Sequence, residues 1–150
     1  MKVYPDTSYL CATYRKQDNT ARADAFNVDL EEPLPVSTFL LLEFRQSVRF
    51  QARLFEKDPN KGFPKTEGAA MLRALQSDLA DGILELVAPD WADVHRLAEE
   101  LSAKHTESGG HRLADILHVA TAIHFGAEQF LTFDANQKKL AEAEGLVASL

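Results

Sequence analysis

Cysteine is almost absent from this chain, since Cys11 is the only one among 150 residues. A single thiol cannot form an internal disulfide, which excludes a disulfide-stapled secreted scaffold, and it cannot supply a cysteine-rich zinc site. One free cysteine is compatible with the reducing conditions of the cytoplasm. We therefore expect a cytoplasmic protein.

Positive charge is also scarce. The chain has 16 Lys and Arg against 23 Asp and Glu, which gives a net charge of −7. A chain this acidic does not bind nucleic acid through its bulk charge. Any contact with RNA or DNA therefore needs a local basic patch or a bound cation.

Long apolar runs are missing as well. The longest tight run covers residues 39–42, far short of the ~20 residues of a membrane-spanning helix. The first residues lack the apolar core of a signal peptide. Hydrophobic residues nevertheless make up 45% of the chain and charged residues 26%, as is typical of a folded globular protein. We expect one domain over residues 1–150, with no membrane partner.

Short apolar segments alternate with longer segments of helical periodicity. Strands are expected over residues 2–5, 34–36, 84–88, 129–133 and 146–148, and helices over 7–16, 20–29, 38–57, 65–79, 91–104, 112–125 and 135–144. The segment 108–110, Ser-Gly-Gly, is expected to break the chain between two of these helices. Strands interleaved with helices of ten or more residues predict an α/β fold with a mostly parallel sheet.

Acidic residues occupy comparable places in four of these segments. Asp6 and Asp134 directly follow expected strands, while Glu43 and Asp115 lie in early turns of expected helices. In a parallel sheet, the residues just beyond the strand ends gather at one edge, where ligands bind. We therefore expect the four carboxylates to meet in one crevice.

The helix around Asp115 has an apolar stripe, which consists of Leu113, Ile116, Leu117, Ala120 and Ile123. Asp115 lies about 100° from the centre of that stripe, by the helical repeat. A carboxylate at the border of a buried face needs a reason to be there, because acidic residues are rarely buried unless they are paired.

Repulsion between like charges predicts that such a cluster of acids binds a cation. Two like charges 4 Å apart repel by ~1 kcal/mol in water and ~4 kcal/mol at an effective dielectric of 20, so four acids cannot all ionise together without a cation. Oxygen ligands without a thiolate favour Mg²⁺ or Mn²⁺. A divalent ion there can activate water and neutralise a phosphoryl oxygen, which suits cleavage of a phosphodiester.

Each acid also has a purely structural interpretation. Asp6 and Asp134 could cap the helices that follow them, because Asp is a favoured N-cap residue. Asp115 could complement a helix dipole, and Glu43 could lie on a solvated face. These alternatives stay open at the level of the sequence.

Basic residues near the expected crevice are candidate substrate contacts. Arg45 and Arg49, followed at the same spacing by Arg53 and Lys57, form a stripe along the helix that carries Glu43. This stripe could follow RNA phosphates, or it could be a solvated face. Arg112 precedes Asp115 by one helical turn and could contact a phosphate, pair with an acid, or serve structure alone.

Two other chemistries are less well supported. His111, Asp115 and His118 share one helix edge, but no cysteine or third histidine nearby completes a zinc site, so His118 is expected to be packed or hydrogen-bonded. The segment Asp6-Thr7-Ser8 begins like the nucleophile loop of haloacid-dehalogenase-type phosphatases, yet Ser8 stands where their second Asp is needed.

The acidic segments resemble the motifs of PIN-domain nucleases. The likeness rests on residues 6–10 (DTSYL), on Glu43, on residues 113–122 (LADILHVATA), and on residues 130–134 (FLTFD) with the following Gln137, Leu140, Ala141, Gly145 and Leu146. These motifs occur in the family's order over nearly the whole chain. Among PIN domains, the length is most similar to that of VapC-type toxins of toxin–antitoxin pairs.

The resemblance implies a three-layer α/β fold and a Mg²⁺- or Mn²⁺-dependent endoribonuclease. Asp6, Glu43, Asp115 and Asp134 would be its catalytic acids and metal ligands, and Thr7 and Ser8 further candidate substrate contacts. It also implies an RNA substrate, a cognate antitoxin and a homodimer. A catalytically silent PIN-like RNA-binding or interaction module and a metal-dependent phosphatase remain alternatives.

Apolar side chains on the early helices are candidates for the antitoxin or dimer surface. Tyr9, Phe39 and Phe50 are expected to be exposed for this purpose.

Overall fold

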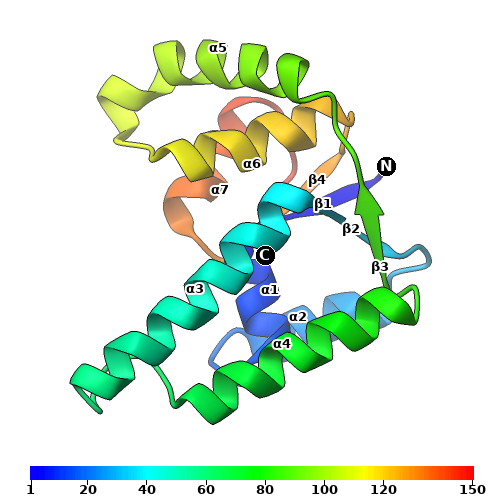
Figure 1. The fold of residues 1–150 in the computed structure, drawn as a ribbon. Helices are drawn as coiled ribbons and strands as arrows, with labels where there is room; N and C mark the ends of the chain where they lie inside the picture. The colour runs from blue at the N-terminus through cyan, green and yellow to red at the C-terminus, as the bar shows by residue number, and fades with distance from the viewer. The chain divides into compact units, whose positions relative to one another are not determined.

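The computed structural model describes all residues, 1–150, as seven helices and four strands (Figure 1). In chain order these are β1 (Val3–Pro5), α1 (Thr7–Tyr14), α2 (Thr20–Val28), β2 (Leu34–Ser37), α3 (Thr38–Lys57), α4 (Lys65–Ala80), β3 (Leu84–Val87), α5 (Trp91–Gly109), α6 (Leu113–His124), β4 (Gln129–Leu131) and α7 (Ala135–Ala143). The alternation of short strands and helices predicted from the sequence is confirmed. None of the helices combines the length and the apolar character that crossing a membrane requires.

The chain divides into two compact units, which are described separately. The first unit comprises Met1–Tyr9 and Val87–Leu150, and the second comprises Leu10–Leu86. Helix α1 therefore begins in the first unit and ends in the second.

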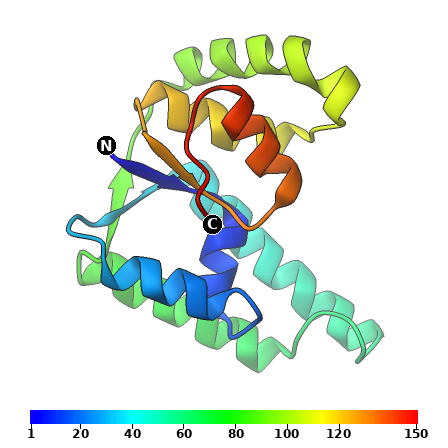
Figure 2. The same ribbon diagram turned by 180° about the vertical axis from the view of Figure 1, so that it is seen from behind.

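The first unit is built on a parallel pair of strands. β1 pairs with β4 so that Val3 lies opposite Gln129, and Figure 2 shows the two strands next to each other. The predicted last strand is reduced to a single parallel bridge between Gln129 and Val147. Both pairings are parallel, which agrees with the sheet type expected from the sequence.

Pro5 ends β1 without interrupting this pairing. Its neighbour Asp6 donates its backbone N–H to the Leu131 carbonyl over 3.0 Å. Successive N–H groups of a strand point to opposite sides. The missing N–H of Pro5 therefore faces away from β4, and the β1–β4 ladder loses no bond.

Helix α5 begins at a strong cap and is longer than predicted. The Asp90 carboxylate accepts from two backbone N–H groups of the first turn, and Val94, Ala98 and Leu101 recur on one buried face. The helix extends into the expected break and ends at Gly109. Gly110 follows as the C-cap, with a φ of 66° in the left-handed conformation that glycine adopts without penalty. The expected end of this helix at about residue 104 is wrong, because one glycine inside a last turn is tolerated.

Helix α6 lies beside α5 in both views (Figures 1 and 2). Its buried side chains include Ile116, Val119 and Ala120, together with His118. Leu113, which the apolar stripe placed on the buried face, is instead 73% exposed. The stripe is thus wrong at its first residue, because the first turn of a helix can extend beyond the element on which the helix packs.

The second unit contains a hairpin of α3 and α4. Ser37 caps α3 by accepting from the Leu40 backbone N–H over 3.2 Å. The face of α3 that includes Phe44 and Val48 is buried. Gly68 of α4 lets the helices approach, since a Cβ there would lie 3.1 Å from the Val48 side chain.

The polar loop between α3 and α4 is fixed at three points. Asp58 accepts from the backbone N–H groups of Asn60 and Lys61, Phe63 is buried, and Gly62 has a φ of 63°. A Cβ at Gly62 would lie 2.0 Å from the carbonyl oxygen of Gln51. The loop is therefore an ordered closure of the hairpin.

Candidate functional site

Asp6 is a fully buried acid at the carboxyl end of β1. Its Oδ1 accepts from the Ser8 hydroxyl at 2.6 Å and from the Tyr9 backbone N–H at 3.0 Å. Its Oδ2 accepts from the Thr132 hydroxyl at 2.5 Å. The hydrogen bond from the Tyr9 backbone N–H is the helix cap that the structural interpretation predicted. The hydrogen bonds from the Ser8 and Thr132 hydroxyls are additional to this cap.

The hydroxyls of Ser8 and Thr132 tie the two strand ends together. Ser8 Oγ accepts from the Phe133 backbone N–H at 2.8 Å, and Thr132 Oγ1 accepts from the Asp134 backbone N–H at 3.0 Å. Each hydroxyl has one proton, which it donates to Asp6. The segments after β1 and β4 thus converge on one carboxylate, as the parallel topology predicted.

Two opposing effects act on the Asp6 carboxyl. Burial raises its pKa above the usual 3.8, because charge is disfavoured away from water. The hydrogen bonds from Ser8, Thr132 and Tyr9, and the nearby His118, lower the pKa, and burial is the larger effect. A bound cation would favour the charged form of Asp6.

Asp134 caps α7 and retains a free oxygen. Its Oδ1 accepts from the backbone N–H groups of Asn136 at 2.8 Å and Gln137 at 2.9 Å. Its Oδ2 accepts no hydrogen bond within the chain. The structural and functional interpretations of this acid are therefore compatible, because the cap occupies only one oxygen.

In the first turn of α6, Asp115 likewise has one oxygen in a hydrogen bond and one that accepts none within the chain. Its Oδ2 accepts from the backbone N–H of Arg112 at 3.3 Å and lies 3.8 Å from the Arg112 Nε. The Asp115 side chain is 14% exposed, whereas that of Arg112 is 85% exposed. The partial pairing of Arg112 with Asp115 leaves most of the guanidinium open to solvent.

The histidine on the buried face of α6 has the packed role expected from the sequence. His118 is fully buried, and its Nε2 lies 3.5 Å from the Thr7 hydroxyl oxygen. Thr7 and Ser8, which were candidate substrate contacts, therefore both have polar partners within the first unit. Their contact with substrate stays a prediction.

The remaining predicted residues belong to the second unit. Glu43 lies in the second turn of α3 and is half-buried. Along the same helix, Arg45 is half-buried and Arg49 is exposed. Their association with the acids of the first unit stays a prediction.

The donor chemistry of the first-unit acids fits a hard divalent cation. Asp6, Asp115 and Asp134 supply only oxygen, and the last two each keep one oxygen free of hydrogen bonds within the chain. No three His, Cys, Asp or Glu side chains lie close enough together to hold a metal ion as they stand. The chemistry therefore fits the metal, while the complete ligand set stays a prediction.

Thr132 is the residue of this network that the sequence interpretation did not single out. It lies inside the motif of residues 130–134, as the one hydroxyl in an otherwise apolar strand end. A buried hydroxyl needs a hydrogen-bond partner, so its place two residues before Asp134 was a usable signal.

The predicted docking surface is wrong at Tyr9. It is fully buried and stacks on Phe133, with ring centroids 5.9 Å apart. Phe39 is half-buried, and Phe50 is 52% exposed as expected. Tyr9 is buried because the segment after β4 brings an aromatic partner to it, which local sequence does not reveal.

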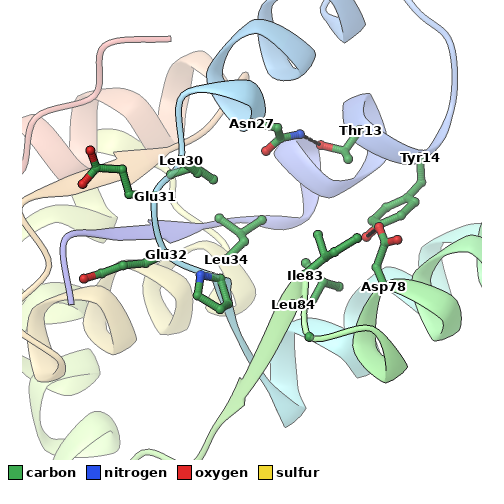
Figure 3. A pocket seen from close by; sticks show the side chains of 12 residues that line it. Thr13, Tyr14, Asn27, Leu30, Glu31, Glu32, Leu34, Asp78, Ile83 and Leu84 are labelled. Carbon is green, nitrogen blue, oxygen red and sulfur yellow. Dashed lines mark hydrogen bonds between the residues drawn. The ribbon is translucent and has the colours of Figure 1, made fainter.

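A separate pocket of about 510 Å³ lies in the second unit (Figure 3). Leu34 and Ile83 contribute apolar walls, while the Tyr14 hydroxyl donates to Asp78 at 2.6 Å. None of the predicted acids lines it. The pocket is therefore not the crevice expected from the sequence.

Helices that alternate with short parallel strands, and acids that follow β1 and β4, define an α/β protein with an acidic strand edge. A model of the PIN domain family matches residues 3–143. The chain therefore belongs to the PIN domain family. Comparison with curated protein sequences gives no match.

Solved structures give the same fold. VapC20 of Mycobacterium tuberculosis, described as a toxin that cleaves the sarcin–ricin loop, is 20% identical, with a TM-score of 0.65 over 97% of each chain. PAE2754 of Pyrobaculum aerophilum is 19% identical, with a TM-score of 0.63 over 99% of this chain and 90% of that one. VapBC2 of Rickettsia felis, solved with promoter DNA, is 17% identical, with a TM-score of 0.63 over 99% and 98%. These likenesses confirm the predicted PIN-like α/β fold.

Proposed function

We propose that this protein is a metal-dependent endoribonuclease of the VapC toxin type. The observation that carries the proposal is the convergence of the segments after β1 and β4 on the buried Asp6. A carboxylate held by neutral hydroxyls, with two partly free acids in the same unit, is suited to bind a cation more than to stabilise the fold. Membership of the PIN family supports the same conclusion.

In this proposal Asp6, Glu43, Asp115 and Asp134 are the metal ligands and water-positioning acids. Mg²⁺ or Mn²⁺, when bound, would supply a polarised water and a positive charge for a phosphoryl oxygen. Ser8 and Thr132 hold Asp6 in place, and the caps at Asp115 and Asp134 fix the direction of their free oxygens. We propose that the two compact units form one domain, which the family match across both of them supports.

Arg112, Arg45 and Arg49 are the proposed phosphate contacts, with Thr7 as a further candidate. Arg112 best fits this role because its guanidinium is largely exposed beside Asp115. The chain would act on RNA in the cytoplasm, restrained by a cognate antitoxin, and would form a homodimer. The fold shared with VapC20, described as a toxin that cleaves the sarcin–ricin loop, and with VapBC2 supports this assignment.

Two acids in equivalent structural positions give the test a matched control. Asp134 caps α7 and Asp90 caps α5, each by accepting from two backbone N–H groups. Asn caps helices about as well as Asp. Asp134→Asn and Asp90→Asn should therefore have similar stabilities, yet only Asp134→Asn should lose cleavage.

The measurement is the cleavage rate of total RNA by the full chain, with Mg²⁺, with Mn²⁺ and with a chelator. The parent and Asp90→Asn should cut only with metal, and Asp134→Asn should be slower by at least about 100-fold, as expected when a metal ligand is lost. Cleavage by Asp134→Asn at the parental rate would overturn the site. RNA binding without cleavage by the parent would instead favour a catalytically silent module.

A further inference from the structure

The loop between α5 and α6 contains a histidine that the proposed function does not use. His111 is half-buried, and its ring is held from two sides. We infer that His111 and Asn136 are positioning residues, which fix the loop that leads into α6 and its Asp115 against the start of α7, where Asp134 lies. This inference rests on the proposed function of these acids.

On the first side, the His111 ring lies against Gly109, the last residue of α5. A Cβ at Gly109 would lie 2.5 Å from Nε2 of His111 and 2.9 Å from its Cδ2. Only glycine leaves room for the imidazole in this position. The two adjacent glycines thus have different roles, since Gly110 is the C-cap of α5 with a left-handed φ of 66° and Gly109 makes space for the ring.

The second side is the carboxamide of Asn136. Its Nδ2 lies 3.3 Å from the Gly109 carbonyl oxygen, to which it donates, and 3.2 Å from Nδ1 of His111. An amide nitrogen can only donate, so Nδ1 of His111 must be the acceptor. The neutral ring therefore carries its proton on Nε2, and one amide group uses both of its protons to hold the loop.

These contacts connect the two acids. Asn136 also donates its backbone N–H to Asp134 Oδ1 at 2.8 Å. Arg112, the residue after His111, donates its backbone N–H to Asp115 Oδ2 at 3.3 Å. A short chain of hydrogen bonds and one peptide link thus runs from Asp134 to Asp115. A shift of the His111 ring would move one carboxylate relative to the other.

The test uses two matched pairs of variants of the full chain. His111→Asn keeps an acceptor oxygen close to the position of Nδ1, whereas His111→Leu removes it. Gly109→Ala displaces the ring without removing any polar group, whereas Ser108→Ala changes an exposed neighbour whose hydroxyl only donates to the His105 carbonyl.

The first readout is independent of metal and of activity. Nitrogen NMR of the metal-free parent above pH 8 should show Nδ1 of His111 unprotonated and Nε2 protonated. In Gly109→Ala the signals should move to the tautomer mixture of a free imidazole. A parental ring protonated on Nδ1 would overturn the inference.

The second readout is Mn²⁺ affinity, together with kcat and KM for RNA. His111→Leu and Gly109→Ala should each weaken Mn²⁺ binding by about 10- to 100-fold, as outer-shell substitutions at metal sites do. They should lower kcat with KM nearly unchanged, while His111→Asn and Ser108→Ala stay within a few-fold of the parent. Unchanged Mn²⁺ affinity and kcat in His111→Leu would overturn the positioning role.

Asp134→Asn distinguishes a failure of the positioning role from a failure of the proposed function. If it abolishes cleavage and Mn²⁺ binding while His111→Leu changes neither, the proposed function stands and the positioning role is wrong. If the parent neither binds Mn²⁺ nor cuts RNA, the proposed function fails, and the inference fails with it.

Discussion

Replacing Asp6 by Asn tests whether burial or hydrogen bonding dominates at the centre of the site. The substitution keeps the shape of the side chain and removes its charge. It also turns one acceptor oxygen into an amide donor that faces Ser8, Thr132 or the Tyr9 backbone N–H, all of which now donate to Asp6.

The expected effect has a constant part and a pH-dependent part. A buried donor left without its acceptor costs about 1–3 kcal/mol at every pH, so Asp6→Asn should be less stable than the parent by that amount in acid. Because burial raises the pKa of Asp6 above 3.8, the folded parent retains a proton that the unfolded chain has lost. Its free energy of unfolding should then fall by about 1.4 kcal/mol per pH unit above about pH 4, until the folded pKa is passed.

The assay is urea unfolding of the two proteins in chelator between pH 3 and 8. The stability difference between them isolates Asp6, since the other acids titrate in both. The parent's advantage should shrink as the pH rises and return when Mg²⁺ is added at pH 7, by about 2.7 kcal/mol at 100 times the dissociation constant. A difference that stays constant or grows with pH would refute the reasoning, because the hydrogen bonds would then outweigh burial.

The other predictions concern the second unit and need no metal. Gly62→Ala should lower the free energy of unfolding by more than about 2 kcal/mol, because it adds a clash with the Gln51 carbonyl to a left-handed φ. Gly82→Ala, with a φ of 73° and nothing within 4 Å of its Cβ, should cost only the conformational ~1–2 kcal/mol; equal melting temperatures for the two variants would contradict this account. Tyr14→Phe removes a 2.6 Å hydrogen bond to Asp78 and should cost about 1.5–3 kcal/mol in chemical denaturation, as for bonds to a charged group; no measurable loss would show that solvent replaces the bond.

Local signals in the sequence determined the elements and their starts. Ser37, Asp90 and Asp134 each precede a helical pattern and accept the cap bonds that such residues favour. The period of the apolar residues separated helices from strands, so the α/β class followed before any coordinates. The position of Asp6 could be predicted for the same reason, because Asp6 directly follows the first strand in the sequence.

Only the tertiary structure decided which side chains are exposed and which residues they contact. Leu113 was assigned to a buried face from helical spacing, and Tyr9 was a candidate for an exposed docking surface. Both assignments are wrong, because burial depends on which distant segment packs against a residue. Thr132 became part of the site through a bond to Asp6, 126 positions away in the sequence. A single sequence carries no record of such a pairing, since the hydroxyl and the carboxylate each look ordinary within their own segments.

The structure also decided what the acids do for the fold. From the sequence, ligand binding competed with a structural role for both acids, which was a helix cap for Asp134 and an interaction with a helix dipole for Asp115. The structure shows that capping occupies one oxygen of each and leaves the other unbonded within the chain. Residue types and spacing determined which carboxylates stand near strand ends and helix starts, but only the packed chain could direct each oxygen, because hydrogen-bond direction depends on positions set by the whole fold.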